Sequence, residues 1–550
     1  MNFIMYLGAK YFTEEKWYAL ALFAVSLASS ILQTNGIATL SSQLMTSVQS
    51  NQEKTSYRYF WFYAGACLVF VLLYYLWYYF NNELLTKIRP WVRTEIVSLL
   101  LSTNNQKFSE TNFSKLNSPI NRIVDMYYFI SYTIISELLP TFIYLVVSSV
   151  YFTYINPFYG LIFFVGNVCL TSYWLYHLQN IIDSNDEYEK KISETDIHLI
   201  DLLNNVDKVI YRGQTNEEIR DFAALGNQNF NLAKRYYSLT NGHLTVMTII
   251  IFSVVLASLF HLIRLVFQKK IDPTLFIASF TILMLYREKV SCIIELLPNL
   301  VDFIGRTENV LHHFKHVNDH YDSIESNEYD PVDLDFKEIQ FINVTYRYGD
   351  NPSVFENRNY YLRTSEQNII GITGRSGNGK STFIKLLLRM YECNAGKITI
   401  DGVDISQLDP NYIRREITYV NQTSKLFDRK VVDNMLYGCS NREVCDFFLE
   451  KIMQYPNITK LYQNTDIHNK QAGLLGENLS GGQRQIVNMI GGLINPSKIL
   501  VLDEPTNALD PELKSEILSL IKDFRRYKQA IIIITHDKDV FPLFNQQIHM

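Results

Sequence analysis

A glycine-rich segment at residues 374–381, GRSGNGKS, contains the residue types that hold phosphate groups. Glycines let backbone N–H groups approach an anion, a lysine reaches the outer phosphates of a nucleotide, and a serine hydroxyl can ligate Mg²⁺. The segment follows the apolar stretch NIIGIT (368–373) and precedes STFIKLLLRM, which is the strand–loop–helix context that a P-loop requires. We therefore expect a phosphate site at Gly374, Arg375, Ser376, Gly377, Asn378, Gly379, Lys380, Ser381 and Thr382.

Two further apolar stretches end in residues that suit phosphate chemistry. KILVLDE (498–504) predicts a strand that ends in Asp503, suited to holding Mg²⁺ through water, and Glu504, suited to polarising an attacking water. AIIIITH (530–536) predicts a strand that brings His536 to the same edge of a parallel sheet, where it could sense a γ-phosphate. Solvated acids and a structural histidine are the alternatives, and the P-loop makes them the weaker interpretation.

Residues 476–485, GENLSGGQRQ, form a second glycine-rich turn, which leads into a predicted helix. It offers N–H groups to an anion but has no lysine. With these motifs in this order, the chain closely resembles the ATP-binding cassette (ABC) transporter family, whose signature is LSGGQ, here 479–483. The resemblance implies that two cassettes pair head to tail. Each signature (Ser480, Gly481, Gly482 and Gln483) then closes on the γ-phosphate of the ATP bound by the other chain.

The same resemblance assigns roles to further positions. Tyr348 matches the aromatic residue that stacks on adenine, and Asp510 matches a loop that contacts the partner cassette. Gln422 matches the glutamine that joins the Mg²⁺ site to the membrane domain, which makes Ser381, Gln422 and Asp503 the expected metal ligands. Glu504, His536 and Gln422 are the expected catalytic residues, and ATP and Mg²⁺ the expected cofactors of an ATP hydrolase.

One segment departs from the family pattern. The helix after the signature usually contains Ala-Arg-Ala, whereas this chain has RQIVNMIGGL (484–493). Because glycine is a poor helix former, Gly491 and Gly492 should weaken that helix.

Long apolar runs dominate the chain before residue 305. The runs near 17–34, 59–80, 134–154, 157–177, 243–264 and 273–296 are each long enough to cross a bilayer. The third and fourth are separated only by INP (155–157), which predicts a tight hairpin. We predict an all-α transmembrane domain of six helices (1–315), a polar linker (316–333) and an α/β P-loop NTPase domain, the ABC cassette (334–550). This order resembles an exporter-type half-transporter.

The basic residues predict how the chain lies in a membrane. The long polar stretches 81–126 and 178–242 contain Lys87, Arg89, Arg93, Lys107, Lys115, Arg122, Lys190, Lys191, Lys208, Arg212, Arg220, Lys234 and Arg235. The connections on the other side contain little more than Lys54, Arg58, Lys269 and Lys270. Since basic residues accumulate on the cytosolic side, we place both termini, the long stretches and the cassette there. The segments 113–125 and 207–222 resemble coupling helices, with ordinary amphipathic helices as the alternative.

Composition limits the remaining classes. The formal charge of −5 over 550 residues is too near neutral to suggest nucleic-acid binding. The six cysteines form no CxxC pair, so we expect reduced packing residues rather than disulfides or metal ligands. The expected partners are a second half-transporter chain, most simply an identical one, the lipid bilayer and a transported solute such as a lipid, peptide, thiol conjugate or amphipathic compound.

The substrate itself is less well indicated. In REKVSCIIELLPNLVDFIGR (287–306), helical spacing places on one face Glu288, Ser291, Glu295, Asn299, Asp302 and Arg306, which suits a water-filled pathway. Of these, Glu288, Glu295 and Asn299 are the candidate substrate residues. A solvated cytosolic helix face is an equally weighted alternative. The rival function is an ABC-type ATPase without transport, such as a soluble DNA-repair or translation ATPase, which the apolar runs disfavour.

Overall fold

The computed structural model describes residues 3–102, 117–311, 332–349, 351–365, 367–375, 377–422, 425–463, 466–507 and 509–550. Contacts divide them into two compact units, one that ends at residue 311 and one that begins at residue 332. Ser376, most of the predicted linker and part of the segment 113–125 lie outside the described residues.

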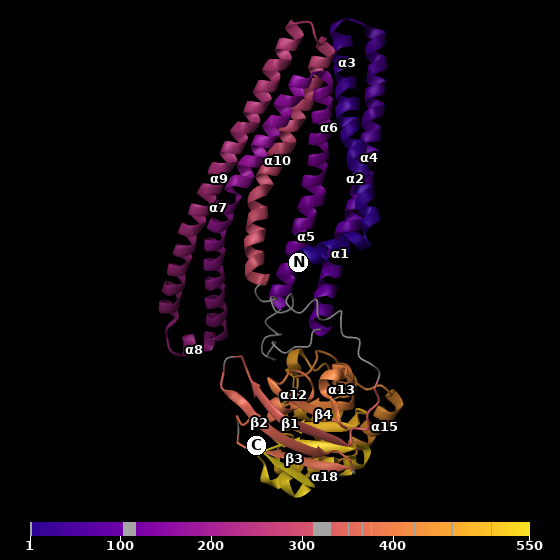
Figure 1. The fold of residues 1–550 in the computed structure, drawn as a ribbon, viewed down its shortest axis with the longest axis vertical. Coiled ribbons are helices and arrows are strands. Elements are labelled where there is room, and N and C mark those ends of the chain that lie inside the picture. The colour runs from indigo at the N-terminus through magenta and orange to yellow at the C-terminus, as the bar shows by residue number, and fades with distance from the viewer. Residues whose placement is uncertain are drawn as a thin grey trace. The chain divides into compact units, whose positions relative to one another are not determined.

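The first unit is built from long helices (Figure 1). In chain order its elements are α1 (Phe3–Glu14), α2 (Lys16–Ile31), η1 (Leu32–Ile37), α3 (Ala38–Gln49), α4 (Glu53–Ser102), α5 (Asn117–Tyr132), η3 (Thr133–Leu138), α6 (Leu139–Ile155), α7 (Pro157–Asn204), α8 (Val206–Tyr211), α9 (Thr215–Phe267) and α10 (Pro273–Leu311).

Five stretches of the described helices are long and apolar enough to cross a membrane: Lys16–Gln49, Glu53–Ser98, Ile120–Ile155, Pro157–Asn204 and Thr215–Phe267. They contain the first five predicted runs. The sixth run lies in α10, where the charged residues Arg287, Glu288 and Lys289 interrupt the apolar sequence. The transmembrane domain is therefore all-α, with five spans supported by length and composition and a sixth long helix.

The helices extend far beyond the predicted runs. α9 has 53 residues, which at ~1.5 Å per residue is about 80 Å, against about 30 Å of bilayer hydrocarbon. Figure 1 shows α7 and α9 side by side, joined by the short α8. The polar stretch 178–242 is therefore mostly helix. Its polar residues reflect departure from an apolar environment rather than the end of a helix, because Lys, Glu, Gln and Arg all favour helical structure.

The predicted hairpin between the third and fourth spans is present. Asn156 caps α7 by accepting hydrogen bonds from the N–H groups of Phe158 at 3.0 Å and Tyr159 at 3.3 Å, and Pro157 occupies the first helical position. A Cβ on Gly160 would lie 2.1 Å from the Thr153 hydroxyl, so only glycine lets α6 and α7 approach this closely.

Two sheets and seven α-helices form the second unit, as far as it is described. An antiparallel sheet has the order β2 (Ser353–Arg363), β1 (Glu338–Arg347), β4 (Ala395–Ile400), β5 (Val403–Asp404). A parallel sheet has the order β6 (Ile417–Val420), β7 (Ile499–Asp503), β8 (Ala530–Ile534), β3 (Asn368–Thr373), β9 (Gln546–His549). The helices are α12 (Lys380–Leu387), α13 (Pro410–Glu416), α14 (Val431–Met435), α15 (Arg442–Ile452), α16 (Pro456–Tyr462), α17 (Gly481–Ile494) and α18 (Pro511–Phe524).

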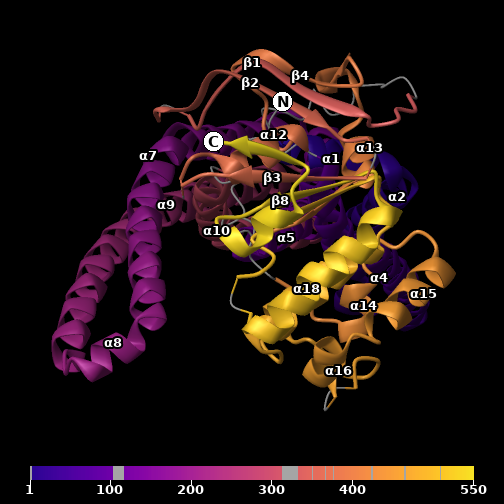
Figure 2. The same ribbon diagram turned by 90° about the horizontal axis from the view of Figure 1, so that it is seen from below.

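These elements lie in layers. In Figure 2, β1, β2 and β4 form one layer, β3 and β8 belong to a second, and α18 lies beyond the second. Every residue of β7 and β8 is buried, as expected for apolar parallel strands covered on both faces. Because β3, β6, β7 and β8 run parallel, their carboxyl ends meet at one edge of the sheet, where ligands bind in such folds.

The cysteine expectation is wrong for one pair. Cys439 and Cys445 form a disulfide, with their Cα atoms 6.4 Å apart. The turn between α14 and α15 brings the two residues together, and their spacing of six residues is not a recognised sequence signal. Cys67, Cys169, Cys292 and Cys393 are free.

Candidate functional site

The P-loop connects β3 to α12, as its sequence predicts. Gly379 immediately precedes α12 with φ +87°, and a Cβ there would lie 2.6 Å from the Val354 side chain. Both the backbone conformation and the close contact therefore require glycine at this position. The Lys380 ammonium donates hydrogen bonds to the backbone carbonyls of Gly374 at 2.9 Å and Arg375 at 3.1 Å. The lysine is thus folded over the loop that it would help to close around phosphates.

Asp503 lies at the carboxyl end of β7 and is 6% exposed. Its Oδ2 accepts hydrogen bonds from the Ser381 hydroxyl at 3.1 Å and from the Tyr419 hydroxyl at 2.8 Å. Burial raises the pKa of this carboxyl, while the bonds from Tyr419 and Ser381 act in the opposite direction. A buried carboxylate beside a serine hydroxyl and the Gln422 amide is a set of hard oxygen donors, so these residues fit Mg²⁺.

Glu504 has a backbone conformation that is unusual for glutamate. Its φ is +52°, in the left-handed region, and it is 7% exposed. The Thr535 hydroxyl donates to Oε2 at 3.1 Å, and Nδ1 of His536 lies 2.7 Å from Oε1. Backbone strain of this kind is often found where a side chain must be aimed at a reacting group. The two contacts hold both carboxylate oxygens of Glu504.

A pocket of about 540 Å³ brings most of these residues together. It is lined by Tyr348, Val354, Gly374, Arg375, Gly377, Gly379, Lys380, Ser381, Thr382, Gln422, Asp503, Glu504 and His536. The Tyr348 hydroxyl lies 2.9 Å from the Thr382 hydroxyl, so the predicted adenine-stacking residue is tied to the start of α12. Residues separated by almost two hundred positions in the chain thus form one cavity at the carboxyl edge of the sheet.

Other predicted site residues lie apart from this pocket. Asn378 donates from its side chain to the backbone carbonyl of Met550 at 2.9 Å. Asp510 caps α18 by accepting from the N–H of Leu513 at 2.9 Å. Ser480 and Gln483 form a reciprocal capping box at the start of α17. Among the described residues that line the pocket, none belongs to the signature, and a Cβ on Gly481 would meet nothing within 4 Å.

Three positioning residues were missed from sequence. They are Thr535, which bonds Glu504; Tyr419, which bonds Asp503; and Gln485, whose side-chain amide donates to the carbonyls of Glu504 at 3.1 Å and Pro505 at 2.9 Å. Thr535 could have been found, because it stands beside His536 at a predicted strand end. No local pattern marks Tyr419 or Gln485.

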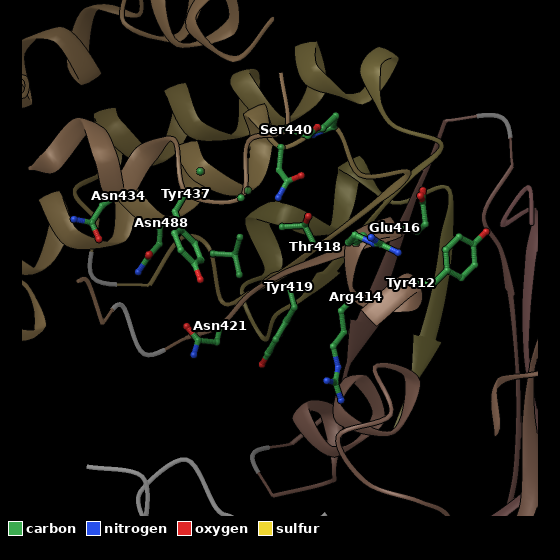
Figure 3. A pocket seen from close by; sticks show the side chains of 17 residues that line it. Tyr412, Arg414, Glu416, Thr418, Tyr419, Asn421, Asn434, Tyr437, Ser440 and Asn488 are labelled. Atoms are coloured by element: carbon green, nitrogen blue, oxygen red, sulfur yellow. The ribbon is translucent and has the colours of Figure 1, made fainter. Parts of the chain in front are cut away.

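A second, larger pocket of about 980 Å³ lies in the same unit (Figure 3). Most of its lining residues have polar or charged side chains: Tyr412, Arg414, Arg415, Glu416, Thr418, Tyr419, Val420, Asn421, Asn434, Tyr437, Gly438, Ser440, Asn488, Gly491, Gly492, Asn495 and Pro496. The segment that departs from the family pattern therefore forms part of this pocket. α17 nevertheless runs unbroken through both glycines, from Gly481 to Ile494.

The candidate substrate residues lie on α10 in the first unit. Glu288, Glu295 and Asn299 are all exposed there. Their neighbour Lys289 faces the other way, with its ammonium 5.3 Å from the ring centroid of Tyr144 on α6. These three residues thus lie on an exposed face of α10, whereas Asp302 of the same stripe accepts a hydrogen bond from the Tyr236 hydroxyl on α9 at 2.6 Å.

Comparisons with known proteins cover both units. A family model described as "ABC transporter transmembrane region" matches residues 17–290, and one described as "ABC transporter" matches residues 358–507. A Rickettsia typhi export ATP-binding/permease protein is 35% identical over 214 residues, which are 39% of this chain and 37% of that protein. The Escherichia coli alpha-hemolysin translocation ATP-binding protein is 35% identical over 201 residues, 36% of this chain and 27% of its own length.

The alignments to these curated relatives thus span little more than a third of the relatives' length at most. A solved structure has a similar fold over nearly the whole chain. It is that of a bacterial Atm1-family ABC exporter with ATP bound, which aligns with a TM-score of 0.78 at 18% identity over 98% of this chain and 93% of the exporter chain.

Proposed function

Because the chain belongs to the ABC transporter family, with a transmembrane region followed by a cassette, we propose that it is an exporter-type half-transporter driven by ATP. In this proposal, ATP binding and hydrolysis move a lipid, peptide, thiol conjugate or amphipathic compound across a membrane. The observation that carries it is the 540 Å³ pocket, which joins the P-loop to Asp503, Glu504 and His536. We keep residues 1–315, 316–333 and 334–550 as the proposed domain, linker and cassette bounds.

The polar and charged groups around the pocket have distinct roles in this scheme. Backbone N–H groups of the P-loop and of the start of α12 bind the phosphates. The Lys380 ammonium gives up its hydrogen bonds to the carbonyls of Gly374 and Arg375 and binds the outer phosphates instead. Ser381, Asp503 and Gln422 would hold Mg²⁺, which supplies charge compensation for the phosphate oxygens. Glu504 accepts a proton from the attacking water, and Thr535 and His536 hold its carboxylate in place.

The position of the signature supports a dimer. Gly481 lies at the N-terminus of a 14-residue helix with open space around it, so no contact within the described chain requires a glycine there. A phosphate from a second chain would use that space and the exposed N–H groups. We propose a homodimer with two composite sites, each formed by the P-loop of one chain and the signature of the other.

Coupling to transport is proposed through the short helix α8. Val206, Ile210 and Tyr211 on the short α8 are exposed apolar side chains, with Tyr211 84% exposed. In the first unit they occupy the connection between α7 and α9, on the side that the basic residues place in the cytosol. We propose that this segment, which overlaps residues 207–222, is one of the coupling segments through which ATP hydrolysis moves the transmembrane helices.

The proposal is tested by Glu504→Gln in the full-length protein reconstituted in lipid. Hydrolysis should fall by about 10²–10⁴, since the general base is lost, while equilibrium ATP binding stays near the wild-type value. Glu512→Gln, an exposed residue of α18, is the matched control and should hydrolyse normally. A Glu504→Gln variant that hydrolyses near the wild-type rate would remove Glu504 from the mechanism. Stimulation by a panel of lipids, peptides, thiol conjugates and amphipathic drugs then identifies the substrate class.

A further inference from the structure

We propose that Tyr419 is a positioning residue for the metal–nucleotide site, acting through Asp503. The inference rests on the function proposed above. Tyr419 lies on β6, which pairs in parallel with β7, and it is in register with Val501 of that strand. Its hydroxyl therefore reaches the carboxylate at the end of β7 from the neighbouring strand, at 2.8 Å.

Both hydrogen bonds to Asp503 meet the same oxygen. Oδ2 accepts from Tyr419 and, at 3.1 Å, from Ser381, which occupies the two lone pairs of that atom. The other oxygen, Oδ1, can then turn toward a metal ion or its bound water. With both donors in place, the carboxylate has one orientation before the metal arrives, so less reorganisation opposes metal binding.

The Tyr419 side chain also connects two cavities. It forms part of the wall of the 980 Å³ pocket, together with its neighbours Thr418 and Asn421 (Figure 3). The Tyr419 hydroxyl bonds Asp503, and Asp503 lines the 540 Å³ nucleotide pocket. Tyr419 itself is not among the described residues that line this pocket. If the wall of the larger pocket moved, the Tyr419 hydroxyl would shift and the orientation of the Asp503 carboxylate would change with it. The affinity of the site for the metal would then change, and not only its affinity for the nucleotide.

The test uses Tyr419→Phe, which keeps the ring and removes the hydroxyl. Equilibrium binding of a fluorescent ATP analogue is measured in the full-length Glu504→Gln background, so that no nucleotide is consumed. We expect the Mg²⁺ concentration for half-maximal nucleotide binding to rise by about 10-fold. This is the change in affinity that the loss of one hydrogen bond to a charged acceptor produces. Binding in EDTA should be unchanged, because Tyr419 does not contact the nucleotide pocket.

A second measurement distinguishes the positioning of Asp503 by the Tyr419 hydroxyl from the packing of the Tyr419 ring in the wall of the larger pocket. With Glu504 intact, kcat at saturating Mg²⁺ should stay within about threefold of wild type, while the half-saturating Mg²⁺ concentration moves as in the binding experiment. Tyr412→Phe is the matched control: Tyr412 lines the same pocket, and its hydroxyl accepts from the N–H of Leu334 at 2.7 Å. That variant should leave the Mg²⁺ dependence unchanged.

Three outcomes would overturn the inference. An unchanged Mg²⁺ dependence in Tyr419→Phe would show that the hydroxyl does not orient Asp503. An equal loss of affinity in EDTA, or an equal shift in Tyr412→Phe, would show a general loss of structure. Absence of any Mg²⁺-dependent ATP binding in the parent protein would instead overturn the proposed function, and this inference with it.

Discussion

At the scale of single residues, the cassette holds each carboxylate of its pocket from more than one direction. Glu504 has a strained backbone and contacts from both Thr535 and His536, and Asp503 has two hydroxyl donors on one oxygen. His536 is 73% exposed in its side chain, whereas Thr535 is fully buried. The buried hydroxyl therefore restricts Glu504 more firmly than the exposed imidazole.

We predict that Thr535→Val lowers kcat for ATP about 10–100-fold with little change in KM, because Glu504 loses a hydrogen bond that orients its carboxylate. The measurement is steady-state ATPase of the reconstituted protein. Thr506→Val is the control, since its hydroxyl bonds Asp537 at 2.8 Å rather than Glu504. If both variants lost activity equally, the effect would come from the loop as a whole and not from Glu504.

At the scale of elements, α17 is determined by packing more than by helix propensity. The glycine pair was expected to weaken it, and the helix is nevertheless continuous. A Cβ on Gly492 would lie 2.4 Å from Val420 on β6 and 3.1 Å from Leu500 on β7, and one on Gly491 would lie 3.2 Å from the Met435 carbonyl. The glycines thus allow the signature helix to approach the parallel sheet and α14 closely.

We predict that Gly492→Ala destabilises the cassette by about 1–3 kcal/mol, although alanine is the better helix former, because the stiff Val420 side chain leaves no room for the added methyl group. Thermal unfolding of the full-length protein measures the change. The opposite sign is expected for Gly226→Ala on α9, where a Cβ meets nothing within 4 Å. A Gly492→Ala variant as stable as wild type would mean that α17 can shift away from the sheet without cost.

At the scale of the whole molecule, we propose that one chain holds two unlike half-sites. The P-loop lies in a pocket with Asp503, Glu504 and His536, and a Cβ on Gly481 at the start of α17 would meet nothing within 4 Å. Gln485 of the same helix donates to the backbone of Glu504 and Pro505. The helix that begins with the signature, which we propose is offered to the partner chain, is thus hydrogen-bonded to the segment that contains Glu504 in the same chain.

We predict that Lys380→Ala and Ser480→Arg each abolish ATPase activity when present in every chain, and that co-expression of the two variants restores it. In a mixed dimer one composite site carries both changes and the other carries neither, so recovery should reach at most about half per dimer. ATPase of doubly tagged, purified mixed dimers is the measurement. Activity that stayed at background would argue that each chain uses its own signature, provided that one intact site can work alone.

A crosslink resolves the case in which two intact sites are needed. Cysteines placed at Ser381 and Ser480 should join two chains in the presence of ATP, and single-cysteine variants control for the native free cysteines. Crosslinks found only within one chain would contradict the shared site.

The family, the two-part architecture and the placement of Asp503, Glu504 and His536 at strand ends could be predicted from the sequence. Local order carries this information: a strand followed by GRSGNGKS, a strand ending in Asp503 and Glu504, and apolar runs long enough to span a bilayer. The expected transmembrane and cassette parts are confirmed by the family matches and the similar exporter fold. The helix ends do not follow from the apolar runs, because the polar residues beyond those runs still form helix.

Only the tertiary structure decided which side chains support the site. Tyr419 reaches Asp503 because β6 and β7 are in register, and Gln485 reaches Glu504 because α17 packs on the sheet through Gly492. The Cys439–Cys445 disulfide depends on a turn between two helices. Each is a contact between elements, fixed by strand register, helix packing or chain reversal. A one-dimensional pattern shows which face a residue occupies, and not which residue of another element lies opposite it.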